Sequence, residues 1–194
     1  MQYFIGIVPN EEYKMKVIGF RNKWENNSIG EVVEPHITLK AQGGLTQDEK
    51  WISKVEEVCK QTRPFKITID KPMFFGDQIL YLNVLSKELH SLHRNIVREV
   101  ATSNDLIRKY FELDNYVPHM TLAKTSYGLT KQELNNMAKL AEKELMPYPV
   151  FNVNFIRVYK ESSPNKYIKH LDIPLDKRNE IFSIKGGRCS SAQN

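Results

Sequence analysis

The stretch Pro35-His36-Ile37-Thr38-Leu39 decides the fold, because its pattern returns later in the chain as Pro118-His119-Met120-Thr121-Leu122. Both copies are His-x-Thr motifs within apolar runs that are typical of β-strands. Since residues i and i+2 of a strand point to the same face, each copy places an imidazole and a hydroxyl side by side. Two such pairs predict two halves of one site.

The repeat extends beyond these motifs. Each is followed by a Gly-Leu-Thr triplet and, three residues after the threonine, by a glutamate: Glu49 in the first copy and Glu133 in the second. The motif histidines are 83 residues apart and the triplets 84, so one inserted residue reconciles the copies. A period of this length is too long for a solenoid and indicates a duplicated half-domain.

Composition limits the class of protein. The chain has 194 residues, of which 41% are hydrophobic, enough for one compact domain or two small lobes. No apolar run approaches the roughly 20 residues of a membrane span, and the first residues lack the basic region of a secretory signal. Cys59 and Cys189 form neither a disulfide framework nor a metal-binding spacing. We therefore expect a cytoplasmic protein without a membrane segment.

Charge distinguishes the end of the chain from the rest. The net charge is +5, and residues 177–194 carry +3 of it, from four basic residues against one acidic residue. Little in this segment is apolar, so we expect a basic, mobile C-terminal tail. Residues 1–176 are expected to form a single bilobal domain. Its mild charge suits a phosphate-bearing ligand but does not by itself indicate nucleic-acid binding.

Hydrophobic spacing predicts the secondary structure. Apolar and β-branched runs, with period-two alternation at 65–70 and 151–155, predict strands at residues 3–8, 32–40, 65–70, 79–85, 151–155 and 167–173 and at the second motif. Helical spacing predicts helices after Asn10, over 47–61 and 86–102, and from Thr130 to the residue before Pro147, with 103–116 as a loop or short turn.

Two local signals refine these predictions. Thr46 with Glu49, and Thr130 with Glu133, have the spacing of a capping box, so each pair is expected to open a helix. At Ile156 the alternation of the preceding strand slips, which indicates a bulge or a change of burial.

These elements predict an α+β protein with a duplicated, bilobal fold. Each half supplies an antiparallel sheet with flanking helices, and the two sheets are related by a pseudo-twofold axis. That symmetry brings both motif strands to the cleft between the sheets, where we expect the active site.

Two histidines at symmetric positions suit phosphodiester cleavage at neutral pH. Since the unperturbed pKa of imidazole is about 6.5, one of His36 and His119 can accept a proton while the other donates one to the leaving oxygen. Thr38 and Thr121 can donate hydrogen bonds to the non-bridging phosphoryl oxygens, where negative charge is held. This scheme needs no metal and no cofactor.

The paired motifs resemble those of the 2H phosphoesterase superfamily, which includes the 2′-5′ RNA ligase-like proteins and cyclic nucleotide phosphodiesterases. The resemblance covers residues 3–175. It implies a bilobal fold and metal-independent hydrolysis of 2′,3′-cyclic or related phosphodiesters. It also implies His36 and His119 as acid and base, and Thr38 and Thr121 as phosphate ligands. Which histidine is the acid stays open.

The function has three interpretations. The first is a hydrolase acting on a cyclic nucleotide or RNA-terminal phosphodiester, with no partner evident besides that substrate and a monomer as the default. The second is 2′-5′ RNA ligation or the degradation of a cyclic oligonucleotide. The third is a non-catalytic sensor that binds a nucleotide. The matched His36 and His119 argue against the sensor, because binding alone needs no acid and base.

Three further residues have competing interpretations. His90 and His93 have the helical spacing of a metal-binding pair, but His93 shares a face with apolar residues, so we favour a core or surface position. Lys40 continues the face of the first motif, where it either contacts a phosphate or ends the strand in solvent.

Aromatic residues and a fifth histidine raise the same question. Tyr3 and Phe4 lie on a strand that could border the cleft and stack a nucleobase, yet core packing is favoured. His170 aligns with Tyr81 on the last strand of each predicted half, so either side chain could face the cleft. For His170 we favour a surface or structural position.

Overall fold

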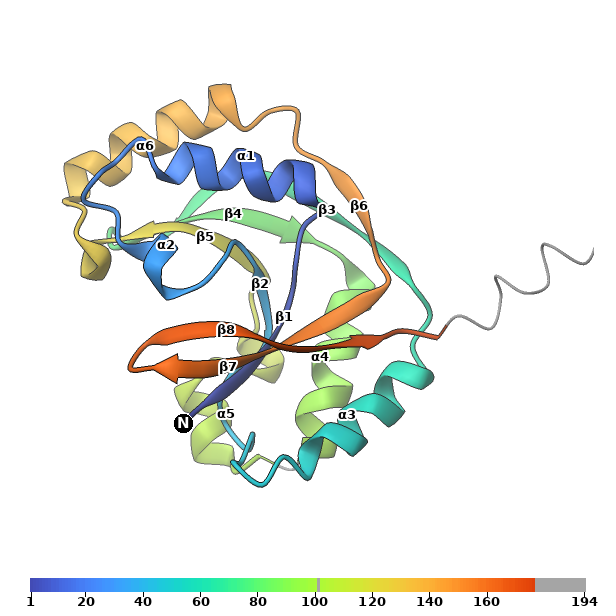
Figure 1. Cartoon of the computed structure of the whole chain (residues 1–194). Coiled ribbons are helices and arrows are strands. Elements are labelled where there is room, and N and C mark those ends of the chain that lie inside the picture. The colour runs from blue at the N-terminus through green and yellow to red at the C-terminus, as the bar shows by residue number, and fades with distance from the viewer. Residues whose placement is uncertain (101, 177–194) are drawn as a thin grey trace, which may run out of the picture.

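We describe the protein from a computed structural model, which covers residues 1–100 and 102–176. The elements form two four-stranded antiparallel sheets flanked by helices (Figure 1). The strands are β1 (Tyr3–Ile7), β2 (Ile37–Lys40), β3 (Phe65–Phe75), β4 (Ile79–Leu85), β5 (His119–Lys124), β6 (Val150–Val153), β7 (Phe155–Ser163) and β8 (Lys166–Pro174).

The helices lie between the strands in sequence. They are α1 (Glu11–Arg21), α2 (Ile29–Val32), α3 (Trp51–Lys60), α4 (Lys87–Val100), α5 (Asn104–Lys109) and α6 (Lys131–Glu144), with 3-10 turns at Leu113–Asn115 and Thr125–Tyr127. None of the described helices is long and apolar enough to cross a membrane. The tail expected at 177–194, which includes Cys189, lies outside the described residues.

The two sheets are built alike, but each takes strands from both halves of the chain. The first has the order β2-β1-β7-β8 and the second β5-β4-β3-β6. A turn at Gly76, where φ is +57°, joins β3 to β4, and the two strands pair. Because β4 also pairs with β5, β3 belongs to the sheet of the second motif. In return, β7 pairs with β1 in the sheet of the first motif. The α+β class and the two antiparallel sheets are confirmed, whereas the expectation that each half builds its own sheet is wrong.

The slip of alternation at Ile156 marks the point where the chain changes sheets. β6 pairs with β3 in the second sheet, and β7 pairs with β1 in the first. Only the exposed Asn154 separates the two strands. The change of sheet reverses which side chains face the core, and this is the change of burial that the sequence indicates.

The motif strands β2 and β5 are edge strands of their sheets and lie against each other. Each carries a bulge at the same place in the repeat. Two adjacent residues of β1 pair with Thr38 and Lys40, which lie two positions apart on β2. In the same way, two adjacent residues of β4 pair with Thr121 and Ala123 on β5. The bulges break the alternation after each threonine, so the residue two positions further on leaves the face of the histidine.

The bulge in β2 turns Lys40 into the interior. Its side chain is fully buried, and its Nζ donates to Oε1 of Glu112 at 2.8 Å and to the carbonyl oxygen of Gly43. Both interpretations of Lys40 from the sequence, a phosphate ligand and a solvated strand end, are therefore wrong. The ion pair instead ties β2 to the segment between α5 and β5.

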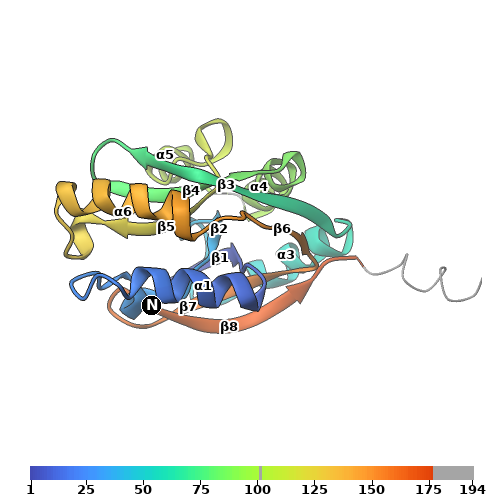
Figure 2. The same cartoon turned by 90° about the horizontal axis from the view of Figure 1, so that it is seen from above.

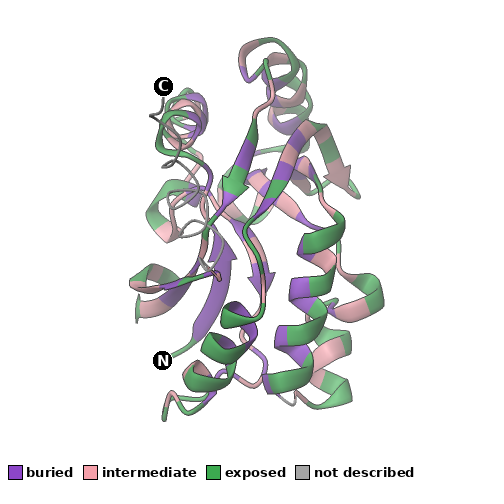
Figure 3. Cartoon of the chain, turned by 90° about the vertical axis from the view of Figure 1, so that its right-hand side faces the viewer, coloured by how far each residue is buried: buried purple, intermediate pink, exposed green. Residues whose placement is uncertain are grey.

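Helices cover the two sheets from opposite ends of the molecule. α3 packs against α4, which contacts β2 and β3, while α6 contacts β3 and β4. α1 lies on β5 and beside α6, so a helix of the first half covers the second sheet (Figures 1 and 2). Buried residues concentrate on the strands and on the inward faces of the helices (Figure 3).

The two predicted capping boxes have different outcomes. Thr130 and Glu133 form one at the start of α6, where Oγ1 of Thr130 accepts from the backbone of Glu133 and the Glu133 carboxylate accepts in return at 2.7 Å. Thr46 and Glu49 do not form one, because the Glu49 carboxylate accepts a 2.6 Å hydrogen bond from the hydroxyl of Tyr3. α3 begins later than predicted, and Tyr3 lies in the core as favoured.

His93 lies in the core, one of the two positions that its face of α4 favours. Its ring is 1% exposed. Nδ1 donates to the carbonyl oxygen of Leu39 at 2.7 Å, and Nε2 accepts from the backbone nitrogen of Leu113 at 2.8 Å. Only a neutral imidazole makes both bonds, and burial lowers its pKa to about 4. His93 therefore joins α4 to the first motif strand.

We expect Thr130→Ala to lower the free energy of unfolding by about 1 kcal/mol, because it removes the cap of α6. Thr46→Ala, at the corresponding position of the repeat, should change it by less than about 0.5 kcal/mol, because its side chain caps no helix. Urea unfolding of both variants beside the wild type measures these values. Equal losses would contradict the presence of a capping box in only one copy.

The lowered pKa of His93 makes stability depend on pH. Above pH 6.5 the ring is neutral in both states, and as the pH falls toward 4 the unfolded chain binds a proton that the folded core excludes. The free energy of unfolding should therefore fall over this range. His93→Gln, whose amide both donates and accepts, should reduce the slope. Urea unfolding at several pH values tests this, and an unchanged slope would show the assignment to be wrong.

Candidate active site

Both motif histidines line one pocket between the facing edges of the two sheets. The pocket has a volume of about 250 Å³ and is lined by residues of both halves. His36 and Thr38 reach it from the start of β2, and His119 and Thr121 from β5. The structure thus brings together the four residues that the sequence singles out, and we name this space the histidine pocket.

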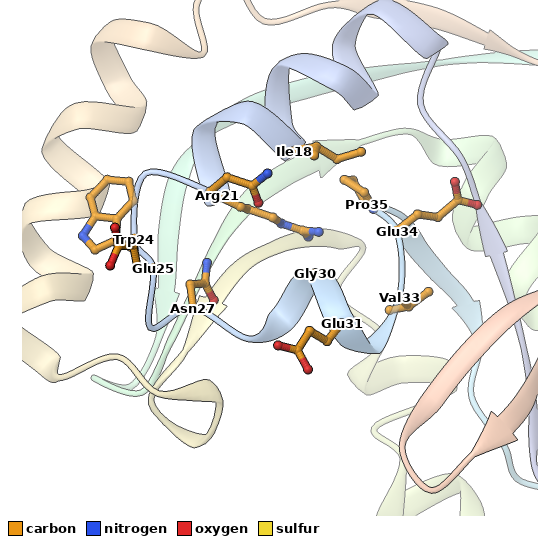
Figure 4. Close-up of a pocket in the computed structure, with 11 residues that line it drawn as sticks. Ile18, Arg21, Trp24, Glu25, Asn27, Gly30, Glu31, Val33, Glu34 and Pro35 are labelled. Atoms are coloured by element: carbon orange, nitrogen blue, oxygen red, sulfur yellow. The ribbon is translucent and has the colours of Figure 1, made fainter.

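A larger pocket, of about 590 Å³, lies between α1, α2 and the segment that leads into β2 (Figure 4). It contains neither motif histidine, so the smaller space is the candidate active site. Arg21 and Val33 line both pockets and form part of the wall between them. We name this larger space the outer pocket.

The two motif histidines are oriented in the same way. Nδ1 of His36 donates to the carbonyl oxygen of Glu34 at 2.9 Å, and Nδ1 of His119 donates to that of Val117 at 2.7 Å. Because a carbonyl oxygen only accepts, the proton of each neutral ring is on Nδ1 and Nε2 is the proton acceptor. Nε2 of His36 lies 3.3 Å from Oγ1 of Thr38.

A stacked pair of aromatic rings backs each imidazole. The pairs are Phe4 with Tyr159 on the side of the first histidine and Phe75 with Tyr81 on the side of the second. In both cases the phenylalanine centroid lies 4.9 Å from the imidazole centroid. The rings keep water from one side of each imidazole.

Burial accordingly lowers the pKa of both imidazoles. The pKa of His36 falls to about 4, through burial and then through the charges of Arg21 and His119. The pKa of His119 falls as well, through burial and the nearby charge of Lys124. Both rings are therefore mainly neutral at pH 7. An anion in the pocket would raise both values, because a negative charge favours the imidazolium.

The histidines differ in how firmly their carbonyl partners are held. The carboxylate of Glu34 accepts hydrogen bonds from Arg157 at 2.7 Å, Tyr159 at 3.0 Å and Lys14 at 3.1 Å. Val117, at the corresponding position before the second histidine, is 43% exposed and has an apolar side chain that cannot form such bonds. The backbone that orients the first histidine is therefore braced more firmly.

Two cations of the histidine pocket escape the sequence analysis. Arg21 ends α1, and Lys124 ends β5 with its ammonium 5.7 Å from the ring centroid of Tyr127. Burial lowers the pKa of Lys124. One sequence feature does indicate that Arg21 is buried: it lies four residues after Val17 and so continues the apolar face of the helix. Lys124 lacks a repeat signal, because Ala41 is its counterpart in the first copy.

Aromatic and amide side chains line part of the remaining wall. They are Phe4, Gln42, Tyr127 and Tyr167. Nε2 of Gln42 donates to the Tyr167 hydroxyl at 3.4 Å. Phe4, for which core packing is favoured from the sequence, thus also borders the site. These side chains combine flat apolar rings with hydrogen-bonding groups, a surface on which a nucleobase can stack.

Other candidate residues lie elsewhere. His170, with Nε2 3.2 Å from Oε1 of Glu49, does not line the histidine pocket, in agreement with the structural position favoured for it. Tyr81 does approach the site, with its ring centroid 5.2 Å from that of His119. In the described part of the chain, no three His, Cys, Asp or Glu side chains are grouped so as to hold a metal ion.

Comparisons with known proteins identify the family and the fold. A family model described as the 2′-5′ RNA ligase superfamily matches residues 20–163. No curated protein matches the sequence. Among solved structures, TT0787 of Thermus thermophilus is similar, with a TM-score of 0.61 and 14% identity, covering 90% of this chain and 98% of that chain.

LigT of E. coli is similar in fold as well. Its complex with NADP⁺ has a TM-score of 0.59 and its complex with 3′-AMP one of 0.57, each with 16% identity and covering 91% of this chain and 98% of that chain. The family match spans most of the chain and both His-x-Thr motifs. The chain therefore belongs to the 2′-5′ RNA ligase superfamily, within the 2H phosphoesterases.

Proposed function

We propose that the chain is a phosphodiesterase that hydrolyses a 2′,3′-cyclic or related phosphodiester of a nucleotide or an RNA end, without a metal and in the cytoplasm. The observation that carries this proposal is the histidine pocket, where two imidazoles with acceptor Nε2 atoms lie with two threonine hydroxyls. An acid, a base and neutral donors are what a phosphodiester needs for cleavage near neutral pH.

The two histidines divide the proton transfers. A neutral imidazole removes a proton from water through Nε2 as the water oxygen forms a bond to phosphorus. The bond between phosphorus and the leaving ribose oxygen breaks, and the other histidine, protonated beforehand, gives its proton to that oxygen. The products are a phosphomonoester and a free hydroxyl, and the histidines have exchanged protonation states. Such catalysis contributes roughly 10²- to 10⁴-fold.

The threonines stabilise the negative charge on the phosphoryl group. Oγ1 of Thr38 lies 3.3 Å from Nε2 of His36, so its hydroxyl and the ring nitrogen share one hydrogen bond. When that ring is protonated, Nε2–H becomes the donor, and the hydroxyl proton is free for a non-bridging oxygen. We propose the same role for Thr121 on the other side.

A nucleotide is the substrate class that the relatives support. E. coli LigT is known in complex with 3′-AMP, phosphate, ATP and NADP⁺. In this chain the rings of Phe4, Tyr127 and Tyr167 border the same pocket as the histidines, which supports stacking of a base beside the cleaved phosphodiester.

RNA ligation is the second candidate, because the matching family model is described by that activity. Ligation uses the same acid-base chemistry, but a ribose hydroxyl replaces water as the nucleophile that attacks phosphorus and opens the cyclic phosphate, and the leaving ribose oxygen takes a proton as before. An RNA with a cyclic phosphate end, incubated with a second RNA that ends in a free 5′-hydroxyl, separates joining from hydrolysis.

We expect His36→Ala and His119→Ala each to slow hydrolysis of a 2′,3′-cyclic nucleotide by roughly 10²- to 10⁴-fold, because each removes one proton-transfer group. Wild-type turnover should persist in EDTA. His170→Ala, a histidine outside the pocket, is the matched control and should keep the rate within about twofold. Hydrolysis that requires an added metal, or that survives both substitutions in the motifs, would refute the proposal.

The pH dependence provides an independent test. The base must be neutral, so kcat/KM should rise as the pH increases through its pKa, and the acid must be protonated, so it should fall through the other. Because both pKa values lie below 6.5, the maximum should lie below that pH. The pH profile of kcat should be shifted to higher pH, because the bound phosphoryl anion raises the pKa of both imidazoles. A kcat/KM maximum on the alkaline side of pH 7 would be inconsistent with these shifts.

A further inference from the structure

Arg21 is a buried cation in the wall between the histidine pocket and the outer pocket. Its side chain is 3% exposed and lines both spaces. It extends from the end of α1 into the space between α1 and α2 (Figure 4). The histidine pocket therefore has a fixed positive charge in its wall, close enough to lower the pKa of His36.

The guanidinium of Arg21 is only partly satisfied. Nη2 donates to the backbone carbonyl of Thr121, but Nε and Nη1 are buried without a hydrogen-bond partner. Burial lowers its pKa to about 9, and within residues 1–100 and 102–176 no carboxylate offsets this effect. A buried charge without a counter-ion destabilises a fold, so its presence calls for a compensating role.

The other half of the molecule shows that holding the motif backbone needs no charge. There the carbonyl oxygen of Thr38 accepts a 2.8 Å hydrogen bond from the hydroxyl of Tyr116. Each motif threonine thus receives one side-chain donor from the opposite half, a phenol in one case and a guanidinium in the other. The phenol donates this hydrogen bond without carrying a charge. Holding the backbone of Thr121 therefore does not explain why residue 21 carries a charge.

We propose that Arg21 is the phosphate-binding cation of the site, and that the phosphoryl group of the substrate supplies the acceptor that its guanidinium lacks. Arg21 is anchored to the backbone of Thr121, whose side chain lines the same pocket as both motif histidines. The inference rests on the proposed function in one respect, namely that the anion is the phosphodiester to be cleaved.

Among residues 1–100 and 102–176, Lys124 is the other cation that lines the histidine pocket, and it suits this role less well. Its ammonium is a point charge on a flexible stem near the ring of Tyr127. The guanidinium of Arg21 is planar, is held in place by its bond to Thr121, and presents donors that match the oxygens of a phosphate. A fixed cation also positions the phosphorus atom between the acid and the base.

Binding of inorganic phosphate to the whole chain, measured by calorimetry, tests the proposal. Arg21→Gln removes the charge but keeps a neutral donor for the Thr121 carbonyl, and we expect it to weaken phosphate binding roughly 10- to 100-fold. Arg21→Lys keeps the charge and should lose less. Arg98→Met removes an exposed charge from α4 that lines neither pocket, and should keep the affinity within about twofold.

The melting temperature separates binding from bracing. Arg21→Gln should melt within about 4 °C of the wild type, and phosphate should raise the melting temperature of the wild type more than that of the variant. Tyr116→Phe, which removes the brace on the other side, should melt lower yet keep the phosphate affinity within about threefold. A folded Arg21→Gln with wild-type phosphate affinity overturns the proposal and makes Arg21 a brace only.

A second measurement applies if Arg21→Gln does not fold. The side-chain Nε–H resonance of Arg21, assigned by its loss in Arg21→Lys, should shift when phosphate is added to the wild type, and a resonance that stays in place overturns the proposal. Failure of the proposed function is distinguishable. A wild type that binds phosphate through Arg21 but hydrolyses no cyclic nucleotide refutes the hydrolysis and leaves the anion site intact.

Discussion

The bulge after each motif threonine is the constraint on which the site depends. Without it, period two would carry Lys40 and Ala123 onto the same face as the histidines, and the ion pair of Lys40 with Glu112 could not form inside. Both motif strands are also edge strands, and they lie against each other without pairing into one sheet. The space that remains between two edges, each ended by a bulge, is the histidine pocket.

This arrangement sets the chemistry through its surroundings. Two stacked ring pairs keep the imidazoles neutral at rest, and the carbonyls of Glu34 and Val117 point their acceptor nitrogens away from the backbone. The halves are similar but not identical, since the three hydrogen bonds that the Glu34 carboxylate accepts have no counterpart at Val117. A duplicated fold has thus kept a symmetric pair of histidines while allowing the support of each to differ, so that two equal side chains have unequal surroundings.

Local sequence predicts what depends on local contacts. The strand at the second motif, the strand at residues 79–85 and the capping box of Thr130 with Glu133 follow from nearest neighbours, and the structure confirms them. The strand predicted at residues 32–40 is shorter, because β2 begins only at Ile37 and Val32 ends α2. The same box at Thr46 fails because Tyr3, distant in sequence, takes the carboxylate. Arg21 could not be placed either, since its partners on β5 come from the other half. The missing information lies in pairings between halves, which spacing along the chain does not contain.

The exchange of strands between the halves also governs how the chain can fold as it is made. β1 and β2 leave the ribosome before β7, the strand that flanks β1 on its other side and lies in the other half of the chain. Until then the first sheet has an open, apolar edge, and its completion requires closure of a loop that spans most of the molecule. The nascent protein must therefore be protected from association with other chains until β7 has been synthesised.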